Sequence, residues 1–203
     1  RMHLGPALYP FLAAHPGIEL TLDLDDRRVD ASSGGFDAVI RHGPILDSRL
    51  MAWKLAPSRR VLCASPAYVA LHGTPRSIED LQDHKGIFYT NRGVADWRFP
   101  RGGAAGTDAI VVHGRLGLGL NNGDMMRDAA IAGLGIALLP MFIAGPAMRA
   151  GQLLSIDIGM DPEQEFIFMA HPDGRKPSAK LRAMADHLRQ AFGSPPYWDP
   201  APA

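Results

Sequence analysis

Two places in the 203-residue chain combine groups suited to holding an anion. The first is the pair Arg41-His42, which follows the apolar residues Val39 and Ile40 at the expected end of a strand. Ligands bind off the carboxyl ends of strands in open parallel sheets, and a guanidinium there holds a carboxylate through two parallel hydrogen bonds. Arg41 has an alternative role as the partner of Asp37 or of a strand-end carbonyl group, and the sequence leaves both interpretations open.

The second place is Asn121-Asn122-Gly123, where a helix is expected to begin. An asparagine side chain caps a helix well, and the free amides of the first turn attract anions. Capping alone would account for the same residues, and the charge of Asp124 would compete with an anion for those amides. The sequence therefore offers a second candidate anion site, with helix capping as its alternative.

Other patterns exclude several kinds of chemistry. Gly133-Leu134-Gly135 follows a helix and opens a strand, whereas a nucleotide-binding glycine motif follows a strand and opens a helix. The single cysteine, Cys63, permits no internal disulfide, and the eight histidines show no metal-ligand spacing. Neither Cys63 nor Ser65 has a neighbouring base, so we expect no catalytic residue, no metal and no cofactor.

The composition is that of an ordinary soluble globular protein, with 46% hydrophobic and 21% charged residues. Lys and Arg together number 21, as do Asp and Glu, and a net charge of zero argues against a nucleic-acid-binding face. No apolar run approaches the roughly 18 residues that cross a bilayer. The start Arg1–Pro6 lacks a signal-peptide core and an initial Met, so we expect a cytoplasmic fragment of a longer protein.

Apolar periodicity and turn residues predict alternating strands and helices, typical of a largely parallel sheet covered on both faces. Helices are expected over residues 4–15, 27–33, 67–72, 123–132, 141–150 and 179–192, with a capped helix after Ser77. Strands are expected over 18–24, 36–41, 51–55, 60–63, 86–90, 110–114, 136–139, 153–158 and 166–170. The residues after Gly193 are expected to be a frayed tail.

An ordered set of short motifs over nearly the whole chain resembles the effector-binding domain of LysR-type transcriptional regulators. These motifs are Leu8–Leu20, Gly35–Arg41, Arg60–Tyr68, His72–Pro75, Asp80–His84, Trp97–Phe99, Gly114–Leu116 and Ala132–Pro140. Each is weak alone, and their order and spacing make the resemblance specific. The Cys-Ala-Ser-Pro-Ala-Tyr run and the Trp-x-Phe are typical of the glycine-cleavage-activator-like branch.

The resemblance implies an α/β, periplasmic-binding-protein-like fold of two Rossmann-like lobes with a ligand cleft between them. Residues 1–64 plus 170–203 would form lobe I and residues 65–169 lobe II. Family members carry an N-terminal winged helix-turn-helix domain, which lies outside this sequence. They also begin this domain with a strand, so lobe I is expected to lack its first strand here.

The resemblance further implies a ligand site at Arg41, His42, Asn121, Asn122 and Gly123, with Trp97, His3 and Asp26 as weaker members. Trp97 has an alternative role in the lobe core, which is the commoner fate of an aromatic residue.

The implied partners are a small-molecule effector, a second copy in a homodimer or homotetramer, and RNA polymerase in the full-length protein. DNA would be bound only through the absent domain, and no membrane is involved. The family pairs copies through the first helix and a lobe II helix, which suggests contacts of Leu8 and Leu12 with Met125 or Ala129 of the partner. A stand-alone solute-binding protein and, less favoured, an α/β enzyme are the alternatives.

Overall fold

The computed structural model describes residues 2–26, 35–43, 50–95, 97–101, 109–172 and 177–199. The chain divides into two compact units, unit 1 (Arg1–Ser58 and Glu165–Ala203) and unit 2 (Arg59–Gln164). The boundary expected after residue 64 falls at the end of β3 (Arg60–Ala64), and the boundary expected after residue 169 falls inside β10 (Glu165–Pro172). All of β3 pairs within the unit 2 sheet, and all of β10 pairs within the unit 1 sheet. The division between the units therefore falls at the start of each strand.

The described sheet of unit 1 is antiparallel, with the order β1-β10-β2. Its strands are β1 (Val39–Gly43), β2 (Leu50–Ser58) and β10, which returns from unit 2 to lie between the other two. The predicted largely parallel sheet is therefore wrong for this unit. Alternation of apolar residues predicts which faces of a strand are buried, and it carries no information on strand direction.

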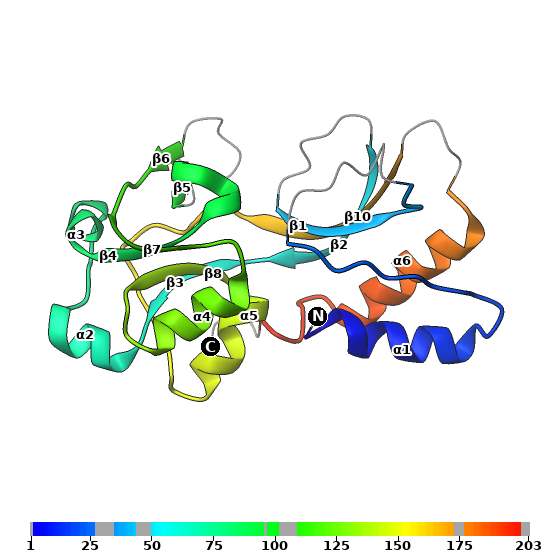
Figure 1. Cartoon of the computed structure of the whole chain (residues 1–203), viewed down its shortest axis with the longest axis horizontal. Coiled ribbons are helices and arrows are strands. Elements are labelled where there is room, and N and C mark those ends of the chain that lie inside the picture. The colour runs from blue at the N-terminus through cyan, green and yellow to red at the C-terminus, as the bar shows by residue number, and fades with distance from the viewer. Residues whose placement is uncertain are drawn as a thin grey trace. The chain divides into compact units, whose positions relative to one another are not determined.

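Two helices of unit 1 lie side by side on one side of this sheet, as Figure 1 shows. They are α1 (Leu4–Ala14) and α6 (Ala179–Phe192), close to the predicted bounds. Leu8 and Phe11 of α1 and Leu188 of α6 are buried. The Ser178 hydroxyl accepts a hydrogen bond from the Leu181 amide and so fixes the start of α6.

Residues 18–24 differ from the prediction, because they form no strand. Three alternating leucines, Leu20, Leu22 and Leu24, are exposed, and about half of the Leu22 surface is open at 48%. The period-two pattern gives this segment the side chains of a half-buried strand. A strand also needs a neighbour to complete its hydrogen bonds, and the described residues supply none to it.

The predicted frayed tail is also wrong. Residues 193–199 form turns that pack on unit 1, and Trp198 is fully buried. Its indole meets the Phe192 ring edge-on with centroids 5.1 Å apart. The Gly-Ser-Pro-Pro sequence correctly indicates the end of α6, whereas the docking of Trp198 depends on distant residues. The predicted helix over 27–33 lies outside the described residues.

Unit 2 contains a mixed sheet of five strands in the order β7-β4-β8-β3-β9. Strand β4 runs parallel to β7 and β8, while β3 runs antiparallel to β8 and β9. The strands are β3, β4 (Lys85–Tyr89), β7 (Arg115–Leu120), β8 (Ile136–Pro140) and β9 (Leu154–Ser155). Strand β7 was not predicted, because Gly117 and Gly119 interrupt its apolar pattern. A Cβ atom at Gly117 would lie 3.2 Å from the Gly86 carbonyl oxygen, so the close pairing favours glycine.

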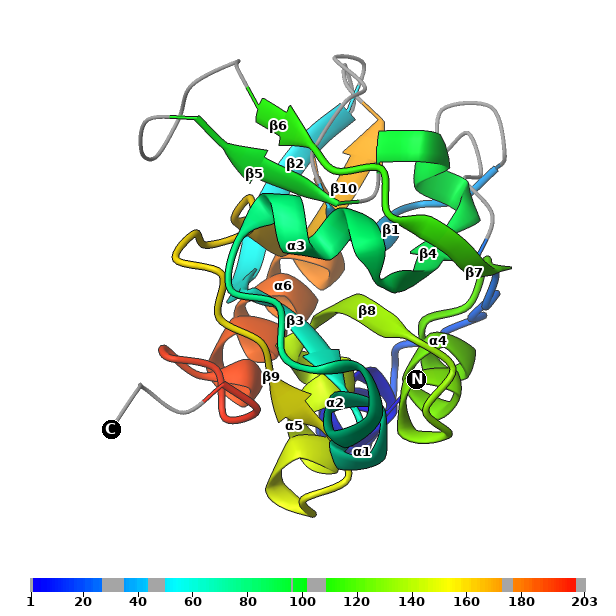
Figure 2. The ribbon, with the colours of Figure 1, turned by 90° about the vertical axis from the view of Figure 1, so that its left-hand side faces the viewer.

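The helices of unit 2 cover both faces of this sheet, as Figures 1 and 2 show. Helices α4 (Gly123–Ile131) and α5 (Met141–Arg149) lie on one side, and α3 (Ile78–Asp83) lies on the other. The remaining elements are α2 (Pro66–His72), the 3-10 helix η1 (Thr90–Ala95), and the hairpin strands β5 (Arg98–Pro100) and β6 (Ala109–Val111). Ser77 caps α3 as predicted, since its hydroxyl accepts from the Asp80 amide.

Strands β3 and β8 are continuous apolar runs because both faces of the unit 2 sheet are covered. Leu62 pairs with Leu138 across the strands and belongs to a buried cluster that includes Leu81 of α3 and Trp97. Cys63 pairs with Ala137 on the opposite face, the side of α4 and α5. A strand enclosed on both faces needs no polar side, as the sequence indicated for residues 136–139.

Candidate functional site

Arg41 and His42 both lie in β1, which continues through Gly43. Successive side chains of a strand point to opposite faces of its sheet. Arg41 stands opposite Phe168 and His42 opposite Ile167 on β10, and both side chains are half-buried. The two predicted ligand residues therefore face different sides of the unit 1 sheet.

His42 contacts a buried carboxylate that the sequence did not reveal. Its Nε2 atom lies 3.0 Å from Oε2 of Glu165, and the Glu165 side chain is only 3% exposed. The ring nitrogen lacks hydrogen-bond geometry to the carboxylate, and the contact is an ion pair only when the ring is protonated. Nothing local to Glu163-Gln164-Glu165 distinguishes the last carboxylate as buried, which is why sequence reasoning missed it.

Asn122 caps helix α4, as the sequence indicated. Its Oδ1 atom accepts a hydrogen bond of 3.0 Å from the Met125 amide, while its backbone is extended. Gly123 begins the helix, and a Cβ atom there would lie 2.5 Å from Cδ1 of Ile143 on α5. Asn121 is exposed at the end of β7. Glycine thus lets α4 begin close to α5, with Asn121 exposed immediately before the cap.

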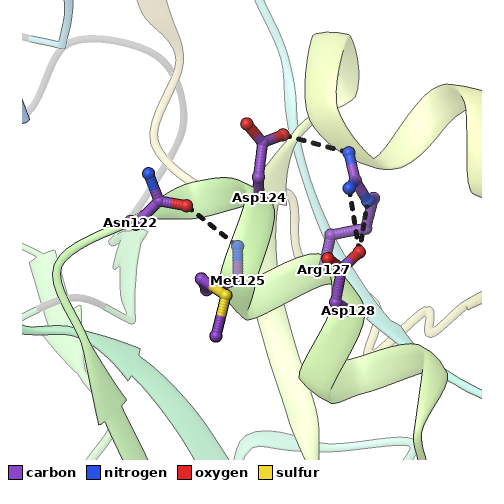
Figure 3. A network of polar contacts seen from close by, with 5 residues as sticks. All are labelled: Asn122, Asp124, Met125, Arg127 and Asp128. Atoms are coloured by element: carbon purple, nitrogen blue, oxygen red, sulfur yellow. Dashed lines mark hydrogen bonds and ion pairs between the residues drawn. The ribbon is translucent and has the colours of Figure 1, made fainter.

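Asp124 is held away from the capping side chain, as Figure 3 shows. Its Oδ1 lies 3.0 Å from Nη1 of Arg127, and the same guanidinium donates through Nε and Nη2 to Oδ1 of Asp128. Arg127 therefore offsets part of the charge of Asp124. The competition that Asp124 would offer to an anion at the helix start is reduced.

Trp97 and His3, two weaker predicted site members, are packed within their own units. Trp97 is fully buried in the unit 2 core, with its ring 4.8 Å from that of Phe88. His3 places Nδ1 2.6 Å from the Tyr197 hydroxyl, and its ring lies 4.8 Å from that of Trp198, tilted by 52°. Asp26 is exposed at the end of the described segment that includes residues 18–24. Trp97 thus has the packing role that the sequence also allowed.

Cys63 has the properties of a small apolar side chain. It is fully buried, its Sγ atom donates to the Ala137 carbonyl oxygen at 3.6 Å, and burial raises its pKa to about 12. A thiol in this state is a poor nucleophile. Within the described ranges, no cluster of three or more His, Cys, Asp or Glu side chains is arranged to hold a metal ion.

One open pocket of about 470 Å³ lies on unit 2, beside α4 and α5. It is lined by Arg127, Asp128, Ile131, Pro146, Ala147 and Gln152. None of the predicted ligand residues lines it, and the charged groups of Arg127 and Asp128 already contact each other. In the described part of the chain, no helix is long and apolar enough to cross a membrane.

Two of the residues expected at a dimer interface are buried inside their own units. Leu8 is 2% exposed and Ala129 is 9% exposed, so the expected contacts at these positions are wrong. Both face inward because the apolar stripe of each helix packs on its own unit. Met125 is exposed and Leu12 is half-buried, so these two remain available.

The sequence model of the LysR substrate binding domain matches residues 1–193. The chain belongs to the LysR substrate-binding domain family.

Related sequences are named as transcriptional regulators. The chain is 35% identical over 186 residues to the uncharacterised HTH-type transcriptional regulator YhjC of Escherichia coli, covering 91% of this chain and 62% of YhjC. It is 31% identical over 192 residues to the HTH-type regulator DmlR of the same organism, covering 95% of this chain and 62% of DmlR. The chain thus spans less than two thirds of these relatives. Their names favour neither an enzyme nor a stand-alone solute-binding protein.

Solved structures of regulatory domains share the fold. The regulatory domain of CrgA from Neisseria meningitidis is similar, with a TM-score of 0.77, 24% identity, and coverage of 95% of this chain and 93% of that domain. The regulatory domain of the C227S variant of AphB from Vibrio vulnificus has a TM-score of 0.72 and 26% identity, covering 93% of this chain and 92% of that domain. The α/β, two-lobe fold expected from the sequence is confirmed.

Proposed function

We propose that this chain is the effector-sensing and oligomerisation domain of a bacterial LysR-type transcriptional regulator. The family match over residues 1–193 is the single observation that supports this most strongly. The ligand would favour one arrangement of the two units, and that preference would pass through the oligomer to DNA-binding segments of the whole protein. Such a regulator acts on DNA in the cytoplasm, with RNA polymerase as a further partner.

The effector is a small carboxylate in this proposal, bound by residues of both units. Arg41 supplies a guanidinium on unit 1, with His42 beside it in sequence. Asn121, Asn122 and the Gly123 amide supply polar groups where α4 begins on unit 2. Arg127 contacts both Asp124 and Asp128, so these side chains keep one net negative charge, and in this proposal the helix-start amides hold the anion. His3, Asp26 and Trp97 are secondary to these groups.

Calorimetry on Arg41→Ala tests the carboxylate site. A panel of small mono- and dicarboxylates, with uncharged amides of the same size, is first screened for compounds that raise the melting temperature. A lost charge-assisted hydrogen bond costs about 1.5–3 kcal/mol, so Arg41→Ala should bind the best carboxylate about ten- to a hundred-fold more weakly. Arg41→Lys should recover part of the loss, because an ammonium lacks the paired geometry.

Two results would contradict the carboxylate proposal. Equal affinity of the parent and Arg41→Ala would remove Arg41 from the site. Stabilisation by the uncharged amides alone would exclude an anionic effector. Arg101→Ala, at an exposed arginine outside the predicted site, is the control for general loss of positive charge.

A homodimer is the oligomer that the surface of the described residues supports. Unit 1 exposes Tyr9 of α1 and the leucines of residues 18–24, which have no strand partner among the described residues. Unit 2 exposes Met125 of α4 and Leu116, which is 75% exposed on the edge strand β7. Each unit thus exposes apolar side chains on a helix and on an extended segment. Two copies related by a two-fold axis would cover both pairs of surfaces at once.

Light scattering on Leu22→Asp tests this dimer. The parent should run as a dimer at high micromolar concentration, and Leu22→Asp should shift it towards monomer, because a carboxylate would be desolvated in the interface. Leu71→Asp, at an exposed leucine of α2, is the matched control and should leave the dimer intact. A parent that stays monomeric, or equal dissociation by both substitutions, would contradict this interface.

We propose further that this chain alone does not bind DNA specifically, since its net charge is zero and the reading of DNA is left to the rest of the protein. Sequence-dependent retardation of DNA by this chain in a low-salt gel-shift assay would contradict that. Within the family, the Cys63–Tyr68 run and Trp97-x-Phe99 support assignment to the glycine-cleavage-activator-like branch.

A further inference from the structure

The chain passes between the units twice, and both passages start at one place on the unit 1 sheet. Unit 1 ends at Ser58 on the way out and resumes at Glu165 on the way back. These two residues are direct cross-strand partners at the ends of β2 and β10. The Ser58–Glu165 rung is therefore the last pairing of the two strands before both connections leave unit 1.

His42 ties the third strand of the sheet to this rung. His42 stands opposite Ile167, which is two residues from Glu165, and Glu165 stands opposite Ser58. The side chains of His42, Glu165 and Ser58 therefore point to the same face of the sheet. From there the Nε2 atom of His42 reaches to 3.0 Å from the Glu165 carboxylate. The contact holds the first residue of β10 against β1, on the side away from β2.

The burial of this group of residues is unusual for polar side chains. Ser58 is fully buried, and its hydroxyl has no hydrogen-bond partner among the described residues. Glu165 is buried beside it. An apolar pair would fill the same space at a lower desolvation cost, so these residues do not serve the stability of the sheet most effectively. In some proteins, buried polar groups of this kind favour one arrangement of the fold over others.

We propose that the His42–Glu165 contact forms a polar clamp that keeps the last rung of β2 and β10, Ser58–Glu165, closed and thereby limits the orientations open to unit 2. Without the clamp, the Ser58–Glu165 rung opens. Each connection then gains a freely rotating residue, and the range of orientations widens. This inference goes beyond the effector proposal and does not depend on it, because the clamp acts without a ligand.

Distance measurement between spin labels tests the clamp. One label is attached in unit 1 at Lys180→Cys and one in unit 2 at Arg149→Cys, both exposed, in a Cys63→Ala background. Pulsed electron resonance then records the distribution of distances in the ligand-free chain. His42→Gln and Glu165→Gln should each broaden the distribution, and hydrogen exchange at the amides of Glu165 and Phe166 should quicken.

Asp186→Asn is the matched control, since it removes one carboxylate from an ion pair of the same length, 3.0 Å to Arg189, away from the crossings. It should leave the distribution as narrow as in the parent. The clamp is refuted if His42→Gln, folded by circular dichroism, keeps the parental width, or if Asp186→Asn broadens it equally. Should Glu165→Gln fail to fold, His42→Gln alone decides, because its amide replaces the ring without burying a new charge.

Discussion

Unit 2 encloses both faces of its sheet, whereas the described part of unit 1 leaves a row of leucines exposed. In unit 2, Leu62 and Cys63 are neighbours on β3 that face different layers, and both are buried. In unit 1, Leu20, Leu22 and Leu24 lie outside any described sheet. Unit 2 therefore has a core that its own residues complete. Unit 1 exposes a further apolar surface at these leucines, and the proposed role of this surface in dimer assembly rests on that difference.

Trp97→Ala tests whether the unit 2 core depends on this one ring. Trp97 is fully buried among Phe88, Phe99 and Leu81, so its loss should lower the free energy of unfolding of unit 2 by about 3–5 kcal/mol. Denaturant unfolding followed separately in each unit measures this effect. Leu116→Ala on the exposed edge strand is the control and should change the free energy by less than about 0.5 kcal/mol.

A loss below about 1 kcal/mol for Trp97→Ala would show that the ring is not part of the core and would favour its alternative role as a member of the ligand site. The same experiment also measures the stability of unit 1. The unfolding of unit 1 should keep its midpoint in Trp97→Ala, because the ring packs entirely on unit 2 residues.

Asn122 has two proposed roles, helix capping and ligand binding, which two substitutions at this position separate. Asn122→Ala removes the acceptor for the Met125 amide and should cost about 1 kcal/mol. Asn122→Asp should keep the cap, because aspartate caps a helix equally well, while its charge should weaken carboxylate binding. Unfolding and calorimetry on both variants give the two readouts. If Asn122→Asp binds the carboxylate as tightly as the parent, the helix start is not part of the site.

Local signals in the sequence predicted much of unit 2. The asparagine cap, the helix and the glycine corner over residues 121–135 stand as predicted, because each depends on neighbours within a few residues. The same holds for Ser77 at the start of α3. The predicted strand over 153–158 shortens to β9, Leu154–Ser155, because only two residues find a partner on β3.

Unit 1 was harder to predict, because its distinctive features join residues far apart in the chain. The burial of Trp198 depends on His3 and Phe192, and the pairing of His42 with Glu165 spans the whole of unit 2. No spacing rule connects such positions. The candidate site shows the same limit, since sequence indicated Arg41 and His42 as a pair and the strand turns them to opposite faces.

His84, which lies between α3 and β4, is expected to make unit 2 sensitive to acid. The Tyr68 hydroxyl accepts from the Lys85 amide and lies 3.1 Å from Nδ1 of His84, so we assign its proton to that nitrogen. Burial, followed by the nearby His72, lowers the pKa of His84, against the opposing charges of Asp80 and Asp83. The neutral ring thus belongs to the folded state.

The sign of the pH effect follows from that lowered pKa. Stability from the neutral ring is fully present above the ordinary histidine pKa of 6.5 and is lost as pH falls through the lower pKa of the folded state. His84→Gln should flatten the acid side of the stability profile of unit 2, and His113→Gln, at an exposed histidine, should not. The effect should be smaller than that of the cap, because water screens this partly exposed ring. An unchanged acid slope in His84→Gln would remove His84 as its cause.

The smallest effect is expected at Cys63, where the enclosed core of unit 2 should prevent any reaction. Burial raises the pKa of the thiol to about 12, so hardly any thiolate exists at neutral pH, and the fully buried sulfur is out of reach of reagents. In the native chain, a thiol reagent should therefore modify Cys63 no faster than unit 2 unfolds locally. In enough denaturant to unfold the chain, one thiol per chain should react. Leu116→Cys, on the exposed edge strand, should react at once and serves as the positive control. Rapid reaction of Cys63 in the native parent would mean that β3 opens far more easily than its burial on both faces implies.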